Sequence, residues 1–223
     1  MEDRGIKNRT SCGPAGRSDS SANNRRCQRN SFGGRPAQDR CIAVTDVIRV
    51  SHTLEQWGAL AGYSLTPASS AHDGRALFWS AGGEVRLFVG SRDDGWFMIH
   101  RSERLGEEHF KFAAPSMSVI EKHLMGSFGQ SIRTSRDLPL IPMPKSVDEV
   151  SAGFSIETRQ FDGVERLALV APDGSVVGIS SGGKMLASAL LIELSIYLTA
   201  TIEDIMASSL DPEGKPLFKV NQR

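Results

Sequence analysis

Cysteine is absent from most of this 223-residue chain, because Cys12, Cys27 and Cys41 all lie in its first 41 residues. An odd number of cysteines, spaced 15 and 14 residues apart, fits neither a disulfide framework nor a zinc motif. The sequence also lacks an apolar run of 18 residues and the apolar core of a secretory signal. We therefore expect a cytoplasmic protein that does not cross a membrane and that holds no metal and no cofactor.

Large apolar side chains are almost missing from residues 1–43, where Ile6, Phe32 and Ile42 are exceptions among Arg, Asn, Ser and Gly. Such a composition predicts a disordered N-terminal extension. It carries nine basic and four acidic residues, which leaves 17 basic and 22 acidic residues for the rest. Two interpretations stay open: a basic arm for nucleic acid, or upstream sequence of a protein that truly starts at Val44. The acidic remainder makes nucleic acid an unfavoured partner.

The chain from 44 to 223 has the patterning of a single α+β domain. Thr53 and Gln56 have the spacing of a capping box, and Gly62 suits the end of the helix predicted over 53–61, with Trp57 and Leu60 on its apolar stripe. Six segments rich in β-branched and aromatic residues alternate with Gly- and Asp-containing turns, which predicts two antiparallel meanders. Their ranges are 76–80, 84–90 and 96–101, then 153–159, 164–171 and 175–180.

Two further helices are expected. Ser116 or Ser118 opens the first, with Glu121 in capping-box register to Ser118. After a proline-rich, extended crossing, the second runs over about 184–209 with a break near Thr199, and its first half is apolar nearly all round. The predicted fold is thus antiparallel β-meanders packed against a few helices, one of them a buried C-terminal helix.

Catalytic motifs are weak in this sequence. The run 180–184 (Ser-Ser-Gly-Gly-Lys) has neither the Gly-x-Ser-x-Gly spacing of a hydrolase nor a complete phosphate loop, so a tight strand-to-helix connection is expected. No two histidines have helical i, i+4 spacing. An enzyme alternative is a small hydrolase that uses His109, Glu107 or Glu193 for acid or base catalysis. The structural alternative for Glu193 is an ion pair with Arg166 or Arg86.

A binding surface is better supported than an active site. Arginine and tryptophan near a hairpin turn are typical of protein contacts, because they bury a large area for a small loss of entropy. The segments 92–96 and 101–109 have that composition, and the alternative for Trp96 is burial in the core. The candidate partner-binding residues are Arg92, Asp93, Asp94, Trp96, Arg104, Glu107, Glu108 and His109.

Three ordered motifs carry a resemblance to a known family. They are Trp57-x-x-x-Ala61-Gly62-Tyr63; 115–124 (Pro-Ser-Met-Ser-Val-Ile-Glu-Lys-His-Leu) followed by Gly129 and Arg133; and 208–218 (Ser-Ser-x-Asp-Pro-Glu-Gly-Lys-Pro-Leu-Phe). Together they resemble immunity proteins that neutralise TNT-type toxins, the tuberculosis-necrotizing-toxin class. The resemblance implies a cytoplasmic inhibitor, without catalysis or cofactor, that blocks the active site of a secreted NAD⁺-hydrolysing toxin domain. The shared residues look like fold-forming positions, so the resemblance assigns no inhibitory contact.

Overall fold

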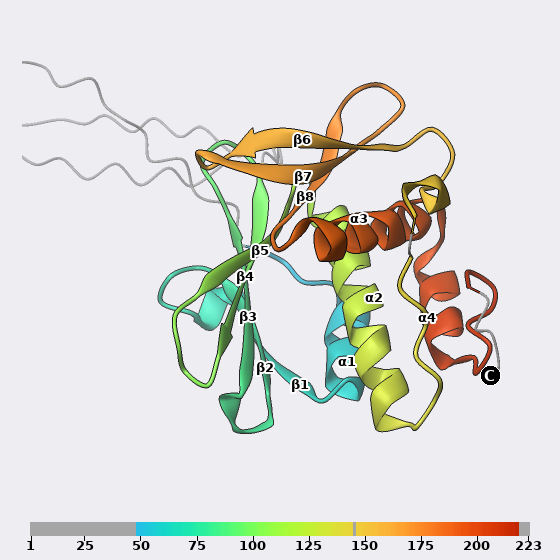
Figure 1. The fold of residues 1–223 in the computed structure, drawn as a ribbon. Coiled ribbons are helices and arrows are strands. Elements are labelled where there is room, and N and C mark those ends of the chain that lie inside the picture. The colour runs from blue at the N-terminus through green and yellow to red at the C-terminus, as the bar shows by residue number, and fades with distance from the viewer. Residues whose placement is uncertain (1–47, 145, 219–223) are drawn as a thin grey trace, which may run out of the picture. The chain divides into compact units, whose positions relative to one another are not determined.

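The computed structural model describes residues 48–144 and 146–218 (Figure 1). Residues 1–43, for which the sequence predicts disorder and offers an alternative start at Val44, lie outside the described ranges. The helices are α1 (His52–Leu60), α2 (Met117–Ser135), α3 (Lys184–Thr199) and α4 (Ile202–Leu210). The strands are β1 (Tyr63–Thr66), β2 (Ala76–Ser80), β3 (Val85–Ser91), β4 (Phe97–Glu103), β5 (His109–Ala114), β6 (Ser155–Phe161), β7 (Val164–Val170) and β8 (Val176–Ser180). No helix among the described residues is long and apolar enough to span a membrane.

All eight strands belong to one sheet in the order β1-β2-β3-β4-β5-β8-β7-β6. Every neighbouring pair is antiparallel, which confirms the predicted α+β class. The two predicted meanders are continuous because β5 pairs with β8 through Phe112 opposite Ser180 and Ala113 opposite Ile179. The first meander has five strands instead of the predicted three. Strand β1 has only four residues, and β5 ends in alanines, which have low strand propensity, so local sequence did not reveal them.

The helices cover one face of this sheet (Figure 1). Helix α2 lies at their centre and contacts α1, α3 and α4 as well as β4 and β5. Helix α3 packs on β7 and β8, as predicted for a buried C-terminal helix, and the chain breaks between α3 and α4 near Thr199 as predicted. The core between the layers includes Leu54, Phe78, Ile99, Phe112, Phe128 and Leu191, each with at most 2% of its surface exposed.

Helix α2 is also the polar centre of the helical layer. Its Met125 carbonyl accepts a hydrogen bond from Trp57 Nε1 at 2.9 Å, and Lys122 Nζ donates to the Ala200 carbonyl beyond α3 at 2.7 Å. Arg133 is fully buried and donates to five main-chain carbonyls, those of Pro139, Ser208, Ser209, Asp211 and Pro212. It thereby satisfies the carbonyls at the end of α4, which have no partner within that helix.

Several predicted helix details are wrong. The N-cap of α1 is Ser51, whose hydroxyl accepts from Leu54 N–H, so Thr53 lies inside the helix. Of the two predicted starts of α2, Ser116 is the N-cap, as predicted, whereas Glu121 accepts the Ser51 N–H at 2.7 Å instead of forming the predicted capping box with Ser118. Tertiary contacts override the local capping pattern here. The apolar stripe of α1 buries Leu54, Trp57 and Gly58.

Three large apolar side chains predicted inside helices are exposed. Leu60, at the end of α1, has 46% of its surface exposed, and Met185 and Leu186, in the first turn of α3, have 84% and 49%. The apolar composition of the first half of α3 therefore overstates its burial.

Candidate protein-interaction surface

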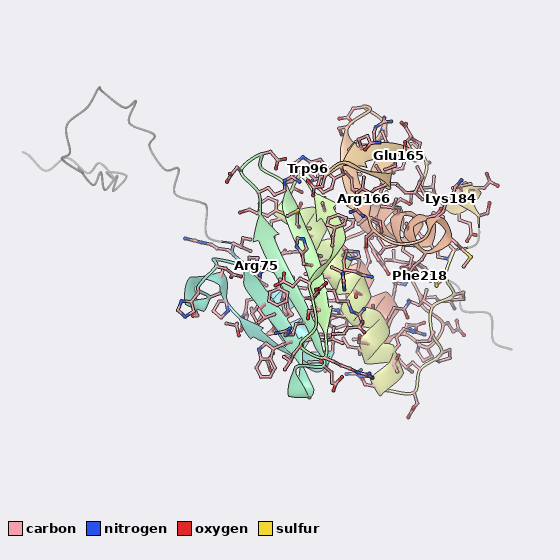
Figure 2. The ribbon with its side chains drawn as sticks, turned by 60° about the vertical axis from the view of Figure 1, so that its left-hand side comes forward. Arg75, Trp96, Glu165, Arg166, Lys184 and Phe218 are labelled. Atoms are coloured by element: carbon pink, nitrogen blue, oxygen red, sulfur yellow. The ribbon has the colours of Figure 1, made fainter. Side chains whose placement is uncertain are left out.

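The face of the sheet opposite the helices carries arginines and aromatic rings. Antiparallel register places Arg86 opposite Ser102 and Phe88 opposite His100, so these side chains share one face. Leu87, Val89 and Ile99 alternate with them, point to the helical layer and are buried. Figure 2 turns this open face toward the viewer, with Arg75, Trp96, Glu165 and Arg166 labelled.

A second, smaller apolar cluster lies on this open face where the two meanders join. Ala113, Ala168 and Ile179, together with Phe161, form its buried part, and Trp96 and Phe110 pack against it. The Trp96 and Phe161 ring centroids are 5.4 Å apart, and those of Phe110 and Phe161 are 5.5 Å apart. Trp96 is half-buried, so it is neither a core residue nor a free one.

Two arginines complete this group. The guanidinium of Arg92 lies 5.0 Å from the Phe161 centroid and forms ion pairs with Asp94, at 2.8 Å, and with Asp162. That of Arg166 lies 4.4 Å from the Phe110 centroid. We call Arg92, Trp96, Phe110, Phe161 and Arg166 the arginine–aromatic cluster.

The arginine–aromatic cluster depends on a tight turn between β6 and β7. Asp162 and Gly163 both have positive φ, 53° and 71°, which is the conformation of a two-residue hairpin turn. Glycine takes up this conformation without strain, and aspartate tolerates it better than most residues. The turn presents the Asp162 carboxylate to Arg92 of the β3–β4 turn, 70 residues away in the sequence.

Arg166 keeps unused hydrogen-bond donors. Its Nε is buried without a partner, and the described residues provide it with neither a hydrogen bond nor an ion pair. Arg86 uses one nitrogen to donate to Ser102 Oγ at 2.8 Å, while its Nε is likewise buried and unpartnered. Guanidinium donors held on aromatic rings next to solvent are suited to carboxylates or carbonyls of a partner.

A second arginine-centred contact spans the same face. Arg75, just before β2, forms a two-pronged ion pair with Glu108, with nitrogen–oxygen distances of 2.5 and 3.0 Å, and also binds Asp73. Its guanidinium lies 4.5 Å from the Phe88 centroid. The hydrogen bonds from Arg75 lower the pKa of Glu108 below its usual value. The carboxylate therefore stays ionised and holds Arg75 across the strands.

The structure separates the eight predicted contact residues into two places. Arg92, Asp94 and Trp96 lie at or beside the arginine–aromatic cluster, with Asp93 exposed in the same turn. The other four lie around the β4–β5 connection, at the opposite end of β4: Arg104, Glu107, Glu108 and His109.

Within this second group, Glu108 binds Arg75 and Arg104 lies 3.4 Å from Glu84. Glu107 and His109 are exposed. His109 is the first residue of β5 and pairs with Arg101 of β4.

Sequence reasoning missed three members of the arginine–aromatic cluster. Phe110 was not assigned to a strand, and Phe161 and Arg166 were not recognised as contact residues. Their proximity to Trp96 follows from the pairing of β5 with β8, a contact between distant segments that local patterns do not encode. The signal that was available was the Asp162-Gly163 turn, which the sequence does predict.

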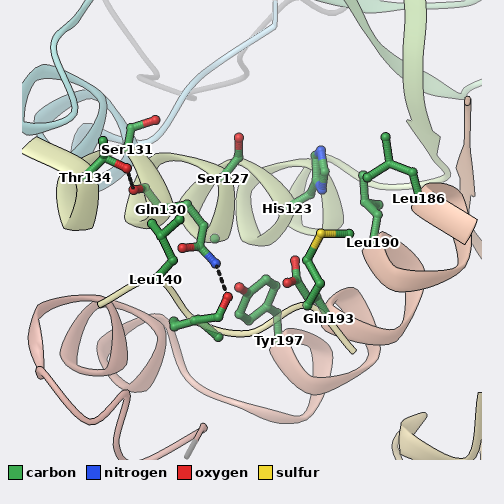
Figure 3. A pocket seen from close by; sticks show the side chains of 13 residues that line it. His123, Ser127, Gln130, Ser131, Thr134, Leu140, Leu186, Leu190, Glu193 and Tyr197 are labelled. Atoms are coloured by element: carbon green, nitrogen blue, oxygen red, sulfur yellow. Dashed lines mark hydrogen bonds between the residues drawn. The ribbon is translucent and has the colours of Figure 1, made fainter. Parts of the chain in front are cut away.

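Glu193 lies on the other side of the sheet. It lines a cavity of about 450 Å³ with His123, Gln130, Leu190 and Tyr197, and Figure 3 shows its carboxyl group facing α2. The predicted ion pair of Glu193 with Arg166 or Arg86 is wrong, because both arginines lie on the open face. Burial raises the pKa of Glu193 to about 7.

The residues of the hydrolase alternative do not come together. Glu193 lines the cavity between α2 and α3. Glu107 and His109 lie at the β4–β5 connection and are not among the residues that line the cavity. Acid and base catalysis requires both groups within hydrogen-bond reach of one substrate. No group of three or more metal-ligating side chains occurs among the residues that the structure describes.

A family model described as Immunity protein 61 matches residues 57–217. The chain belongs to this family. An M. tuberculosis protein named immunity factor for TNT is 42% identical over 175 residues, which cover 78% of this chain and 96% of that protein. The homologous factor of M. bovis has the same identity and coverage.

A solved structure is also similar to this member of the immunity protein 61 family. Its title is Rv3902c from M. tuberculosis, its sequence is 41% identical, and its TM-score is 0.74. The match covers 81% of this chain and all of that one. The three sequence motifs described above lie within or beside the range that the family model matches, and their residues form the contacts around α2.

Proposed function

We propose that this chain is the immunity protein of a TNT-type, NAD⁺-hydrolysing toxin and that it acts in the cytoplasm by blocking the active site of the toxin domain. It performs no catalysis and needs no cofactor. The observation that carries the proposal is the 42% identity to immunity factors for TNT, extending over 96% of their length. The separation of the candidate catalytic residues supports it further.

We further propose that the open face meets the toxin. The arginine–aromatic cluster supplies the residue types that dominate binding energy in protein interfaces. Arg92 is held between Asp94 and Asp162, and Trp96 is held against Phe161, so little side-chain entropy remains to be lost on binding. An interface of standard size, roughly 800 Å² per partner, extends beyond the cluster alone.

In this proposal, the remaining predicted contact residues form the outer edge of the interface. Arg104, Glu107, Glu108 and His109 lie around the β4–β5 connection, and Arg75 is bound to Glu108. The part-buried guanidinium groups of Arg166 and Arg86, on the open face, would bind acidic or carbonyl groups around the toxin cleft. Charged residues at such an edge contribute more to the association rate than to the affinity.

Co-expression tests the function. Cells that produce the cognate toxin domain together with this chain should grow and keep their NAD⁺, and cells that produce the toxin alone should lose both. If co-expressing cells still lose NAD⁺ although the chain is present and folded, the proposed function is wrong.

A titration tests the absence of catalysis. The NAD⁺ hydrolysis rate of a fixed amount of purified toxin should fall linearly with added chain and reach zero at one equivalent. Complete inactivation by a small fraction of an equivalent would instead show that the chain turns over and modifies the toxin.

A further inference from the structure

The cavity between α2 and α3 is separate from the surface proposed to meet the toxin. Its volume of about 450 Å³ lies within the range of small-molecule sites, roughly 300 to 1,000 Å³. It lies in the helical layer, on the side of the sheet away from the arginine–aromatic cluster (Figure 3). The proposed function therefore leaves it without a role.

Aliphatic side chains surround the opening of the cavity. Leu140 and Met143 from the crossing after α2, and Leu186 from α3, all line it, and their exposed fractions are 59%, 48% and 49%. Large apolar side chains that gather at one opening mark a site for an apolar group. Leu190 extends the apolar lining from α3 inward.

Two hydrogen-bond acceptors inside the cavity have no partner. Gln130 uses its amide nitrogen on the Ile141 carbonyl at 3.5 Å, and its Oε1 is buried without a donor. The described residues provide Glu193 with neither a hydrogen bond nor an ion pair. Unsatisfied acceptors in an apolar surrounding are costly, and a donor from a ligand removes that cost.

The charge of the lining selects one class of ligand. No lysine or arginine is among the lining residues, and besides Glu193 the titratable ones are His123 and Tyr197. Burial lowers the pKa of His123 to about 4, so this imidazole is neutral at pH 7. Burial raises the pKa of the Tyr197 hydroxyl, which is therefore also neutral. Above pH 7, where Glu193 is ionised, a bound cation would meet one carboxylate and no lysine or arginine among the lining residues.

We propose that this cavity binds a small amphipathic organic cation, with its ammonium group at Glu193 and its apolar body against Leu140 and Leu190. Binding is reversible and involves no covalent step. The apolar body supplies affinity through burial, and the carboxylate supplies preference for a positive head group.

Three probes of equal chain length test the charge preference: hexylammonium, hexanol and hexanoate. Calorimetric titration of the full chain at pH 8 should show one saturable site for hexylammonium, at least about tenfold weaker binding of hexanol, and the weakest binding for hexanoate. Equal binding of hexylammonium and hexanoate, or no binding of hexylammonium at millimolar concentration, would overturn the proposal.

Two variants locate the site. Glu193→Gln should weaken hexylammonium binding at least about tenfold and leave hexanol binding unchanged, whereas the matched control Glu165→Gln on β7 should change neither. Ser127→Phe, from an exposed position in the lining, should fill the cavity and abolish both. If either Glu193→Gln or Ser127→Phe binds hexylammonium as the wild type does, the cavity is not the binding site. Toxin inhibition, measured on the same samples, should be retained throughout, so the two proposals can fail separately.

Discussion

The two faces of the sheet use their polar side chains differently. On the covered face, Trp57, Lys122 and Arg133 donate to main-chain carbonyls of the same chain, and these bonds join the helices to α2. On the open face, Arg86 and Arg166 rest on or beside aromatic rings and keep donors that no described residue uses. Polar residues of the first kind hold the fold together, and those of the second kind are available to a partner.

This difference explains what the shared motifs mean. The residues that carry the resemblance to the immunity protein family lie mainly around α2, on the covered face. They identify the fold because they make its internal contacts, and they do not indicate which surface meets a toxin. The predictions below separate the two faces by the property that each should control, stability or binding.

The largest expected effect is the loss of Arg133. Arg133→Ala removes the donor to five carbonyls and leaves them buried, so we expect the free energy of unfolding to fall by about 3–5 kcal/mol. Urea unfolding measures it. The control Arg136→Ala, at the exposed end of α2, should stay within about 0.5 kcal/mol of the wild type. Equal losses of unfolding free energy in the two variants would contradict the structural role given to Arg133.

Glu193 should make stability depend on pH. Its pKa is about 7 in the folded chain, against an ordinary value of 4.5, so between these pH values the folded state holds a proton that the unfolded state releases. Stability is therefore lost as pH rises through 7, by roughly 3 kcal/mol in all. Glu193→Gln should differ little from the wild type at pH 4.5 and be more stable at pH 8. A difference that is the same at both pH values would show that Glu193 has an ordinary pKa.

Gly126 tests the packing of α2 against α3. A Cβ there would overlap the Tyr197 ring, so Gly126→Ala should cost about 1–3 kcal/mol by denaturant unfolding. The neighbouring change Ser127→Ala, at an exposed position, should be neutral or slightly stabilising because alanine favours helix. If Gly126→Ala is as stable as Ser127→Ala, the close approach of these helices is not required.

The smallest expected effect belongs to the open face. Glu108→Gln weakens the contact with Arg75, but both side chains are partly exposed, so the cost should stay below about 1 kcal/mol and shrink further in 1 M salt. Urea unfolding at low and high salt measures this. A cost of several kcal/mol that is independent of salt would give Arg75 and Glu108 a structural role like that of Arg133.

Sequence patterns predicted the fold further than the site. They identified six of the eight strands, the turn at Asp162-Gly163 and the break after Thr199, because these depend on local periodicity and turn residues. They missed β5, because its alanines have low strand propensity and belong to the sheet through pairing with β8. The same non-local pairing brings Phe161 to Trp96, so three of the five residues of the arginine–aromatic cluster could not be predicted from local patterns. The partner of Glu193 was predicted wrongly because Glu193 lies on α3 and faces the cavity beside α2, whereas Arg166 and Arg86 lie on the open face.

The most direct test of the proposal that the open face, and not the helical layer, meets the toxin compares inhibition constants for the cognate toxin. Trp96→Ala and Arg166→Ala should each weaken inhibition by at least about 30-fold, or roughly 2 kcal/mol, while remaining folded. Arg136→Ala and Met185→Ala, exposed in the helical layer, serve as matched controls and should inhibit like the wild type. If the open-face variants inhibit normally and the helical-layer variants do not, the toxin meets the other side of the molecule.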